Sequence, residues 1–194
     1  MELESMPATI GILLFDAAEE LDFVGPWEVL TAAASPDDRV LTVAASLQPI
    51  LCEKGMRVLP DVTFETAPVL DVVLVPGGSG ARRVPHEPTA AWLRLAATRC
   101  RWLTSVCTGS FLLANCGLVT GSKITTHHRF LKDLRALGTS EVIAGQRFVR
   151  DGNVVTAAGV ISGIEMALWL AGEVFGAKAM EDARDYIAYD WPPR

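Results

Sequence analysis

Residues 102–117, WLTSVCTGSFLLANCG, decide the fold of this chain. Their first part, Trp102–Val106, is apolar, aromatic and β-branched, which is typical of a buried strand. Their second part, Ser110–Cys116, consists mainly of strong helix formers and ends at Gly117, which suits the position after a helix. No loop residues separate the two parts, so we expect a strand that passes directly into a helix.

The junction of this strand and helix is Cys107-Thr108-Gly109. A strand that turns into a helix within about one residue strains the backbone at the bend and holds the bend side chain clear of the sheet. The N–H groups of the following helix would point at the sulfur and favour a thiolate. Free cysteines usually serve as small buried hydrophobic residues, but this setting predicts that Cys107 is a nucleophile. Cys52, Cys100 and Cys116 lack the setting, and we expect them to be structural.

Length and charge exclude several classes of protein. A chain of 194 residues, half of them hydrophobic, suits a single domain over residues 1–194 with a large core. The net charge of −6 and the absence of any basic run beyond Arg82-Arg83 argue against nucleic-acid binding. Four cysteines without a C-x-x-C pair and only three histidines argue against a metal site.

The chain also lacks the usual targeting segments. Residues 1–6 are acidic and have no signal-peptide pattern. No apolar run approaches the roughly 18 residues of a membrane span. A free thiol fits a reducing compartment, so we expect a cytoplasmic protein.

Strands and helices alternate along the chain, which predicts a doubly wound α/β sandwich around a mostly parallel sheet. We expect Pro26 in a first helical turn, Ser162 as a helix cap and Lys54-Gly55 as the turn of a possible hairpin, and we predict no element over 61–70. The expected strands are 9–15, 40–45, 71–76, 102–106, 124–126 and a hairpin over 148–157, and the expected helices are 27–34, 88–98, 110–116, 129–137, 162–175 and 178–189, before a tail at 191–194.

Chemically active residues follow several of these strands. Because ligands bind beyond the carboxyl ends of parallel strands, Asp22, Gly77-Gly78, Cys107 and His127-His128 should converge. A glycine pair is often only a tight turn, but the N–H groups of Gly78 and Thr108 could together stabilise an anion. His127 is expected to orient or hydrogen-bond a group in the pocket, although a structural role is the commoner one.

Asp22 has apolar neighbours, Leu21 and Phe23-Val24. Burial there would raise the pKa of Asp22 and suit it to acid/base chemistry. The alternative is a carboxylate that only stabilises a helix start. Glu19 and Glu20 lie in a polar run and are expected to be solvated, whereas Glu28 could do the same work as Asp22.

The segments LDFVGPWEVL at 21–30, VPGG at 75–78, TSVCTGS at 104–110 and TTH at 125–127 resemble the DJ-1/PfpI superfamily, and within it the isonitrile hydratase branch. The resemblance implies a flavodoxin-like fold, a homodimer and no cofactor. It also implies hydration of a small electrophile, an isonitrile, to an N-substituted formamide. By the same resemblance Cys107 is the nucleophile, Asp22 the acid/base and Thr108 the residue that follows the nucleophile.

Departures from the family patterns leave alternatives. Hydrolytic members carry histidine directly after the cysteine, where this chain has Thr108. The domain also occurs in AraC-type regulators, but this chain ends at Arg194, and we expect no DNA-binding module. His128 stands where the hydratase branch tends to have an aromatic residue, so the substrate is open. The alternatives are a glyoxalase- or deglycase-like enzyme acting on small aldehydes and a non-catalytic redox or metabolite sensor.

Overall fold

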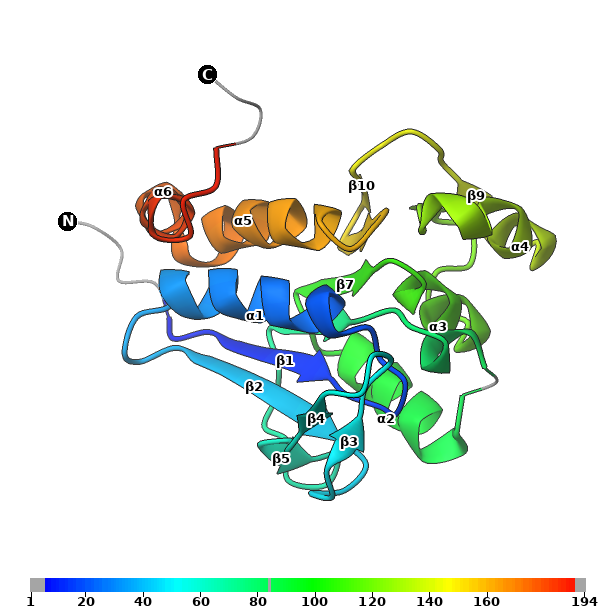
Figure 1. The fold of residues 1–194 in the computed structure, drawn as a ribbon, viewed down its shortest axis with the longest axis horizontal. Coiled ribbons are helices and arrows are strands. Elements are labelled where there is room, and N and C mark those ends of the chain that lie inside the picture. Colours follow the sequence, from blue (N-terminus) through cyan, green and yellow to red (C-terminus); the bar gives the residue numbers. More distant parts are fainter. Residues whose placement is uncertain (1–5, 84, 191–194) are drawn as a thin grey trace.

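The computed structural model describes residues 6–83 and 85–190, so the expected tail at 191–194 lies outside the described residues. A sheet runs through the middle of the molecule (Figure 1). It has seven strands in the order β10-β11-β7-β6-β1-β2-β5. All neighbouring strands are parallel except β10, which pairs antiparallel with β11. The strands of this sheet are β1 (Thr9–Leu13), β2 (Arg39–Ala44), β5 (Val62–Thr63), β6 (Val72–Val75), β7 (Trp102–Val106), β10 (Phe148–Asp151) and β11 (Val154–Ala157).

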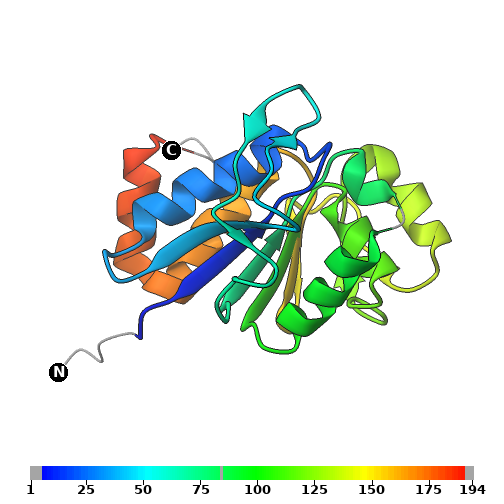
Figure 2. The same ribbon diagram turned by 90° about the horizontal axis from the view of Figure 1, so that it is seen from below.

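Helices cover both faces of the sheet, as Figure 2 shows. Helices α1 (Glu20–Ala33), α5 (Ser162–Phe175) and α6 (Ala177–Tyr186) lie on one face. Helices α2 (Glu87–Ala97), α3 (Gly109–Asn115) and α4 (Leu131–Ala136) lie on the other. The predicted flavodoxin-like α/β sandwich is confirmed.

The central strands form because their side chains are apolar on both faces. In β6, Val72 and Leu74 pack into the core on the α5 side, whereas Val73 and Val75 pack into the core on the α3 side. In β7, Trp102 and Leu103 divide in the same way. A strand buried on both faces needs this continuous apolar run rather than an alternating pattern.

The predicted start of the first helix at Trp27 is wrong. Helix α1 begins at Glu20, so Pro26 lies inside it rather than in its first turn. The Gly25-Pro26 pair instead allows close packing on α5: a Cβ on Gly25 would lie 3.0 Å from Ile164 Cγ1, and one on Gly163 would lie 3.5 Å from Pro26 Cγ. Packing against α5 therefore compensates for the backbone hydrogen bond that a proline cannot donate.

Smaller elements differ from the prediction in part. The segment 61–70 contains β5, and the strand predicted at 124–126 is β8 (Lys123–Ile124), which pairs with β9 (Glu141–Val142) outside the main sheet. Ser162 is the first residue of α5, and its side chain makes no capping hydrogen bond there. The hairpin β3 (Ile50–Leu51) and β4 (Arg57–Val58) is confirmed, as is the turn between β10 and β11. Two short 3₁₀ helices, η1 (Gly80–Arg82) and η2 (His128–Phe130), complete the described elements.

None of the helices over residues 6–83 and 85–190 combines the length and the apolar character that crossing a membrane requires.

Candidate active site

The bend between β7 and α3 has the predicted strained geometry. Cys107 has φ +55°, in the left-handed region that costs a non-glycine residue about 1–2 kcal/mol. Its N–H donates to Ala157 O at 2.9 Å, and Thr126 Oγ1 donates to its carbonyl at 2.9 Å. Only glycine fits two residues later, because a Cβ on Gly109 would lie 2.3 Å from Val75 O. The sheet therefore fixes the bend from both neighbouring strands.

Asp22 reaches the same place from the first turn of α1. Its side chain is fully buried, and its Oδ2 accepts the Gly77 N–H at 2.9 Å. Its Oδ1 is buried and has no hydrogen-bond partner among the described residues. Burial raises the pKa of Asp22 from 3.8 to about 7, against the lowering effect of the Gly77 N–H and with a further rise from the charge of Glu19. The expected rise in this pKa is confirmed.

The predicted thiolate at Cys107 is wrong. Burial, followed by the negative charge of Asp22, raises the pKa of Cys107 to about 12. The N–H and hydroxyl groups of Thr108 lower that pKa but do not outweigh the burial. Before substrate binds, the site therefore holds a neutral Cys107 thiol beside the Asp22 carboxyl group, which titrates near neutral pH.

Thr108 links the bend to the glycine loop after β6. Its Oγ1 accepts the Gly78 N–H at 2.9 Å and donates to Gly78 O at 3.0 Å. The Gly78 N–H, expected to bind an anion, therefore already has a partner here. Gly77 must be glycine, since a Cβ would lie 2.6 Å from both Asp22 Oδ2 and Thr108 N.

His127 precedes η2 and lines the same cleft as Cys107. Its Nδ1 accepts the Arg129 N–H at 3.3 Å, and its ring lies 4.3 Å from that of His128. Burial lowers the pKa of His127, as do the nearby His128 and Arg129. A neutral ring with its proton on Nε2 can therefore orient a ligand, as the sequence suggests.

A cleft of about 400 Å³ opens over these residues. The structure brings Cys107, Thr108, Gly78 and His127 together along it, with Asp22 and Gly77 directly behind. Glu28, the competing carboxylate, is exposed and lines a different groove beside α6. The cleft also contains residues that sequence reasoning did not assign to the site: Glu19, Glu53, Lys54, Ser79, Arg82, Arg129, Phe130 and Val160.

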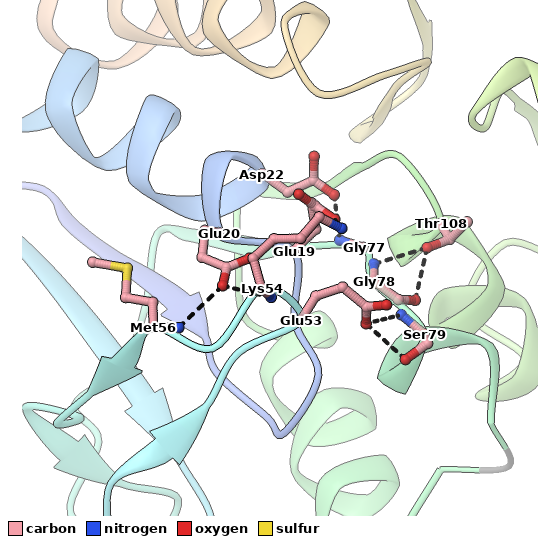
Figure 3. A network of polar contacts seen from close by, with 10 residues as sticks. All are labelled: Glu19, Glu20, Asp22, Glu53, Lys54, Met56, Gly77, Gly78, Ser79 and Thr108. Carbon is pink, nitrogen blue, oxygen red and sulfur yellow. Dashed lines mark hydrogen bonds and ion pairs between the residues drawn. The ribbon is translucent and has the colours of Figure 1, made fainter.

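The turn of the β3–β4 hairpin supplies one wall, through the network drawn in Figure 3. Glu20 Oε1 accepts the N–H groups of Lys54 at 2.7 Å and Met56 at 3.3 Å, and Glu19 pairs with Lys54 Nζ at 3.1 Å. The expectation that both glutamates are solvated is therefore wrong. Glu53 Oε2 accepts from Ser79 N and Oγ at 3.0 and 2.7 Å. These partners are 26 to 36 residues apart in the chain, so no local pattern could reveal them.

The other cysteines lie where the sequence placed them, in the hairpin (Cys52), after α2 (Cys100) and at the end of α3 (Cys116). All four cysteines are free and buried. Within the part of the chain that the structure describes, no group of three or more His, Cys, Asp or Glu side chains is arranged to hold a metal ion.

A model of the DJ-1/PfpI family matches residues 8–173. The chain belongs to this family. It is 42% identical to the isonitrile hydratase of Pseudomonas putida over 185 residues, which cover 95% of this chain and 79% of the hydratase. Within the DJ-1/PfpI family the chain therefore lies on the isonitrile hydratase-like branch.

Solved structures of the family share the fold. A ThiJ/PfpI family protein from Pseudomonas syringae is 30% identical, with a TM-score of 0.88 over 98% of this chain and 78% of the other. DJ-1beta of Drosophila melanogaster, at 22% identity, has a TM-score of 0.85 over 94% of this chain and 98% of its own.

Proposed function

We propose that this protein is a cysteine-dependent hydratase that converts isonitriles to N-substituted formamides. The observation that carries the proposal is the pairing of Cys107 with a buried Asp22 whose pKa is about 7, in a chain 42% identical to an isonitrile hydratase. A carboxyl group with that pKa can both donate and accept a proton near neutral pH.

In the first step, Asp22 donates its proton to the isonitrile carbon while the Cys107 sulfur attacks the same carbon. The thiol proton passes to the Asp22 carboxylate. The product is a thioimidate, R–N=CH–S–Cys107. Protonation of the carbon by Asp22 makes a neutral thiol sufficient, which accords with a thiol pKa of about 12.

In the second step, Asp22 transfers a proton to the imine nitrogen while a water molecule attacks the carbon and gives its proton to the carboxylate. The carbon–sulfur bond of the tetrahedral adduct then breaks. The sulfur recovers a proton as the hydroxyl oxygen loses one, which releases R–NH–CHO and restores both groups. Thr108 supports this step, because its backbone N–H lowers the pKa of the departing thiol.

Formamide production from n-butyl isonitrile by the purified protein tests the proposal. Cys107→Ala should reduce turnover by about 10⁶-fold, as loss of the nucleophile does in a serine protease. Cys116→Ala, at a buried cysteine remote from the cleft, is the matched control and should retain turnover. A folded wild-type protein without turnover of n-butyl isonitrile would refute the hydratase for neutral alkyl isonitriles. Lactate from methylglyoxal would then indicate a glyoxalase-like enzyme, and reversible oxidation of Cys107 by peroxide would indicate a sensor.

We also propose that the hydratase is a homodimer. A groove of about 390 Å³ between α1 and the β3–β4 hairpin is lined by apolar side chains, among them Phe23, Trp27 and Leu59. Trp27 is 38% and Leu59 67% exposed, and gathered apolar surface of this kind marks an interaction site, here assigned to a second copy of the chain. Trp27→Glu should convert a dimer to a monomer in light scattering, whereas Leu95→Glu, on the opposite helical layer, should not. A wild-type monomer would exclude the dimer.

A further inference from the structure

The cleft around Cys107 is more positive than the molecule that contains it. The chain has a net charge of −6. Yet, leaving Cys107 and His127 aside, cations outnumber carboxylates along the cleft. The cations are Lys54, Arg82 and Arg129, and the carboxylates are Glu19 and Glu53. Such a local excess attracts an anion to a site on an acidic protein.

Both carboxylates already have partners. Glu19 pairs with Lys54 at 3.1 Å, which also satisfies that lysine. Glu53 Oε2 receives two hydrogen bonds from Ser79. Among the described residues no carboxylate lies within ion-pair distance of the Arg82 or Arg129 side chain. Glu53 and Arg82 interact through their charges at longer range, but within the described part of the chain neither arginine is held in an ion pair, so both can bind a ligand.

The Arg82 guanidinium is held in position rather than left free. It lies 4.3 Å from the centroid of the Phe130 ring. That ring packs edge-on against Phe111, with centroids 6.4 Å apart and planes at 88°, and Phe111 is only 6% exposed. A cation over an aromatic face is positioned without losing its charge. Arg129 precedes Phe130 in η2 and lines the same cleft, so both arginines belong to one rim.

We propose that Arg82 and Arg129 form a subsite for a carboxylate, so that the substrate is an isonitrile whose substituent carries an anionic group. This inference rests on the proposed function. The isonitrile carbon would meet Cys107 while the carboxylate lies at the arginine rim. The Nε2–H of neutral His127 offers a further donor along the same cleft.

The test compares two probes that differ by one charge, isocyanoacetate and its methyl ester. In the wild type, kcat/KM should be higher for isocyanoacetate, and added salt should reduce the difference. In the double variant with Arg82→Gln and Arg129→Gln, the carboxylate-to-ester ratio of kcat/KM should fall about 10-fold. Arg83→Gln is the matched control, because Arg83 is exposed, adjacent and absent from the cleft, and it should keep the wild-type ratio.

A second measurement does not depend on turnover. Cys107 is alkylated with iodoacetate, which is anionic, and with iodoacetamide, which is neutral, and intact-protein mass follows each reaction. The iodoacetate-to-iodoacetamide ratio of rates should fall in the double variant about as much as the ratio of kcat/KM does. Cys107→Ala provides the background from the other cysteines. Equal ratios in wild type and double variant, in either measurement, would overturn the subsite. If both isonitriles are turned over but the carboxylate-to-ester ratio is equal in wild type and double variant, the hydratase stands and the subsite does not. If neither isonitrile is turned over, the hydratase is overturned, and the alkylation ratio alone decides the subsite.

Discussion

The two ends of helix α3 share a left-handed backbone conformation, but its energetic cost differs between them. Each end has a residue in the left-handed region, Cys107 with φ +55° before the helix and Gly117 with φ +75° after it. At Gly117 this conformation costs little, because glycine has no Cβ and a Cβ there would meet nothing within 4 Å. At Cys107 the same conformation strains a residue that carries a side chain.

The side chains around Cys107 also differ from those around Gly117. Beside Cys107 lies a fully buried carboxyl group, that of Asp22, and the backbone of the bend is fixed by neighbouring strands. Beside Gly117, Cys116 is packed among apolar side chains of the α3-side core. Strain and a buried ionisable group thus coincide at one end only, and that end holds the cleft. Stored strain is a mark of functional sites when the surrounding structure enforces it.

Replacement of Asp22 should have the largest effect on stability. Its folded pKa of about 7 exceeds the ordinary 3.8, so between these pH values the folded protein binds more protons than the unfolded chain. The stabilisation from the protonated carboxyl is complete below about pH 4 and is lost as the pH rises through about 7. Asp22→Asn should therefore match the wild type near pH 4 and be more stable by about 2–4 kcal/mol near pH 8, although inactive.

Urea unfolding across this pH range measures the effect. Glu53→Gln is the contrasting variant, because hydrogen bonds from Ser79 lower the pKa of Glu53 and favour its charged form. It should lose stability above about pH 5, where Asp22→Asn gains it. A constant difference between Asp22→Asn and wild type at every pH would contradict the burial of an ionisable group at the bend.

Alanine at Gly109, which begins α3, and at Gly117, which follows it, should have unequal effects. Gly109→Ala places a Cβ 2.3 Å from Val75 O and 2.8 Å from Pro76 O, both backbone atoms. We expect a loss of about 3 kcal/mol, because the bend must move. Gly117→Ala meets no neighbour and should lose only about 1 kcal/mol, from its positive φ. Equal losses in chemical denaturation would show that the two ends are equally tolerant.

The threonines near the two ends should give the smallest difference. Thr108→Val removes both hydrogen bonds to Gly78 and should cost about 1–2 kcal/mol, with a larger kcat loss than KM change. Thr120→Val removes one exposed bond of 3.5 Å to Gly117 O and should cost less than about 0.5 kcal/mol. Thermal unfolding and steady-state kinetics of both variants measure these losses. Equal losses of stability in the two variants would contradict the difference between the two ends of α3.

Local sequence predicted the structure correctly wherever residues adjacent in the chain determine the conformation of a segment. The strand-to-helix junction at Cys107 and the turn at Gly152 follow from neighbouring residue types, and the structure has both. Local sequence failed where a distant partner decides. The Gly25-Pro26 pair resembles the beginning of a helix, but packing on Ile164 of α5 keeps the helix intact from Glu20.

The sequence by itself determined the α/β sandwich and the bend at Cys107. These depend on hydrophobic runs and steric limits that act over a few residues. Only the tertiary structure decided that the thiol is protonated, that Gly78 bonds to Thr108 and that the hairpin and the arginine rim enclose the cleft. Burial and charge depend on every group nearby in space, and the groups around Cys107 come from six separate segments of the chain.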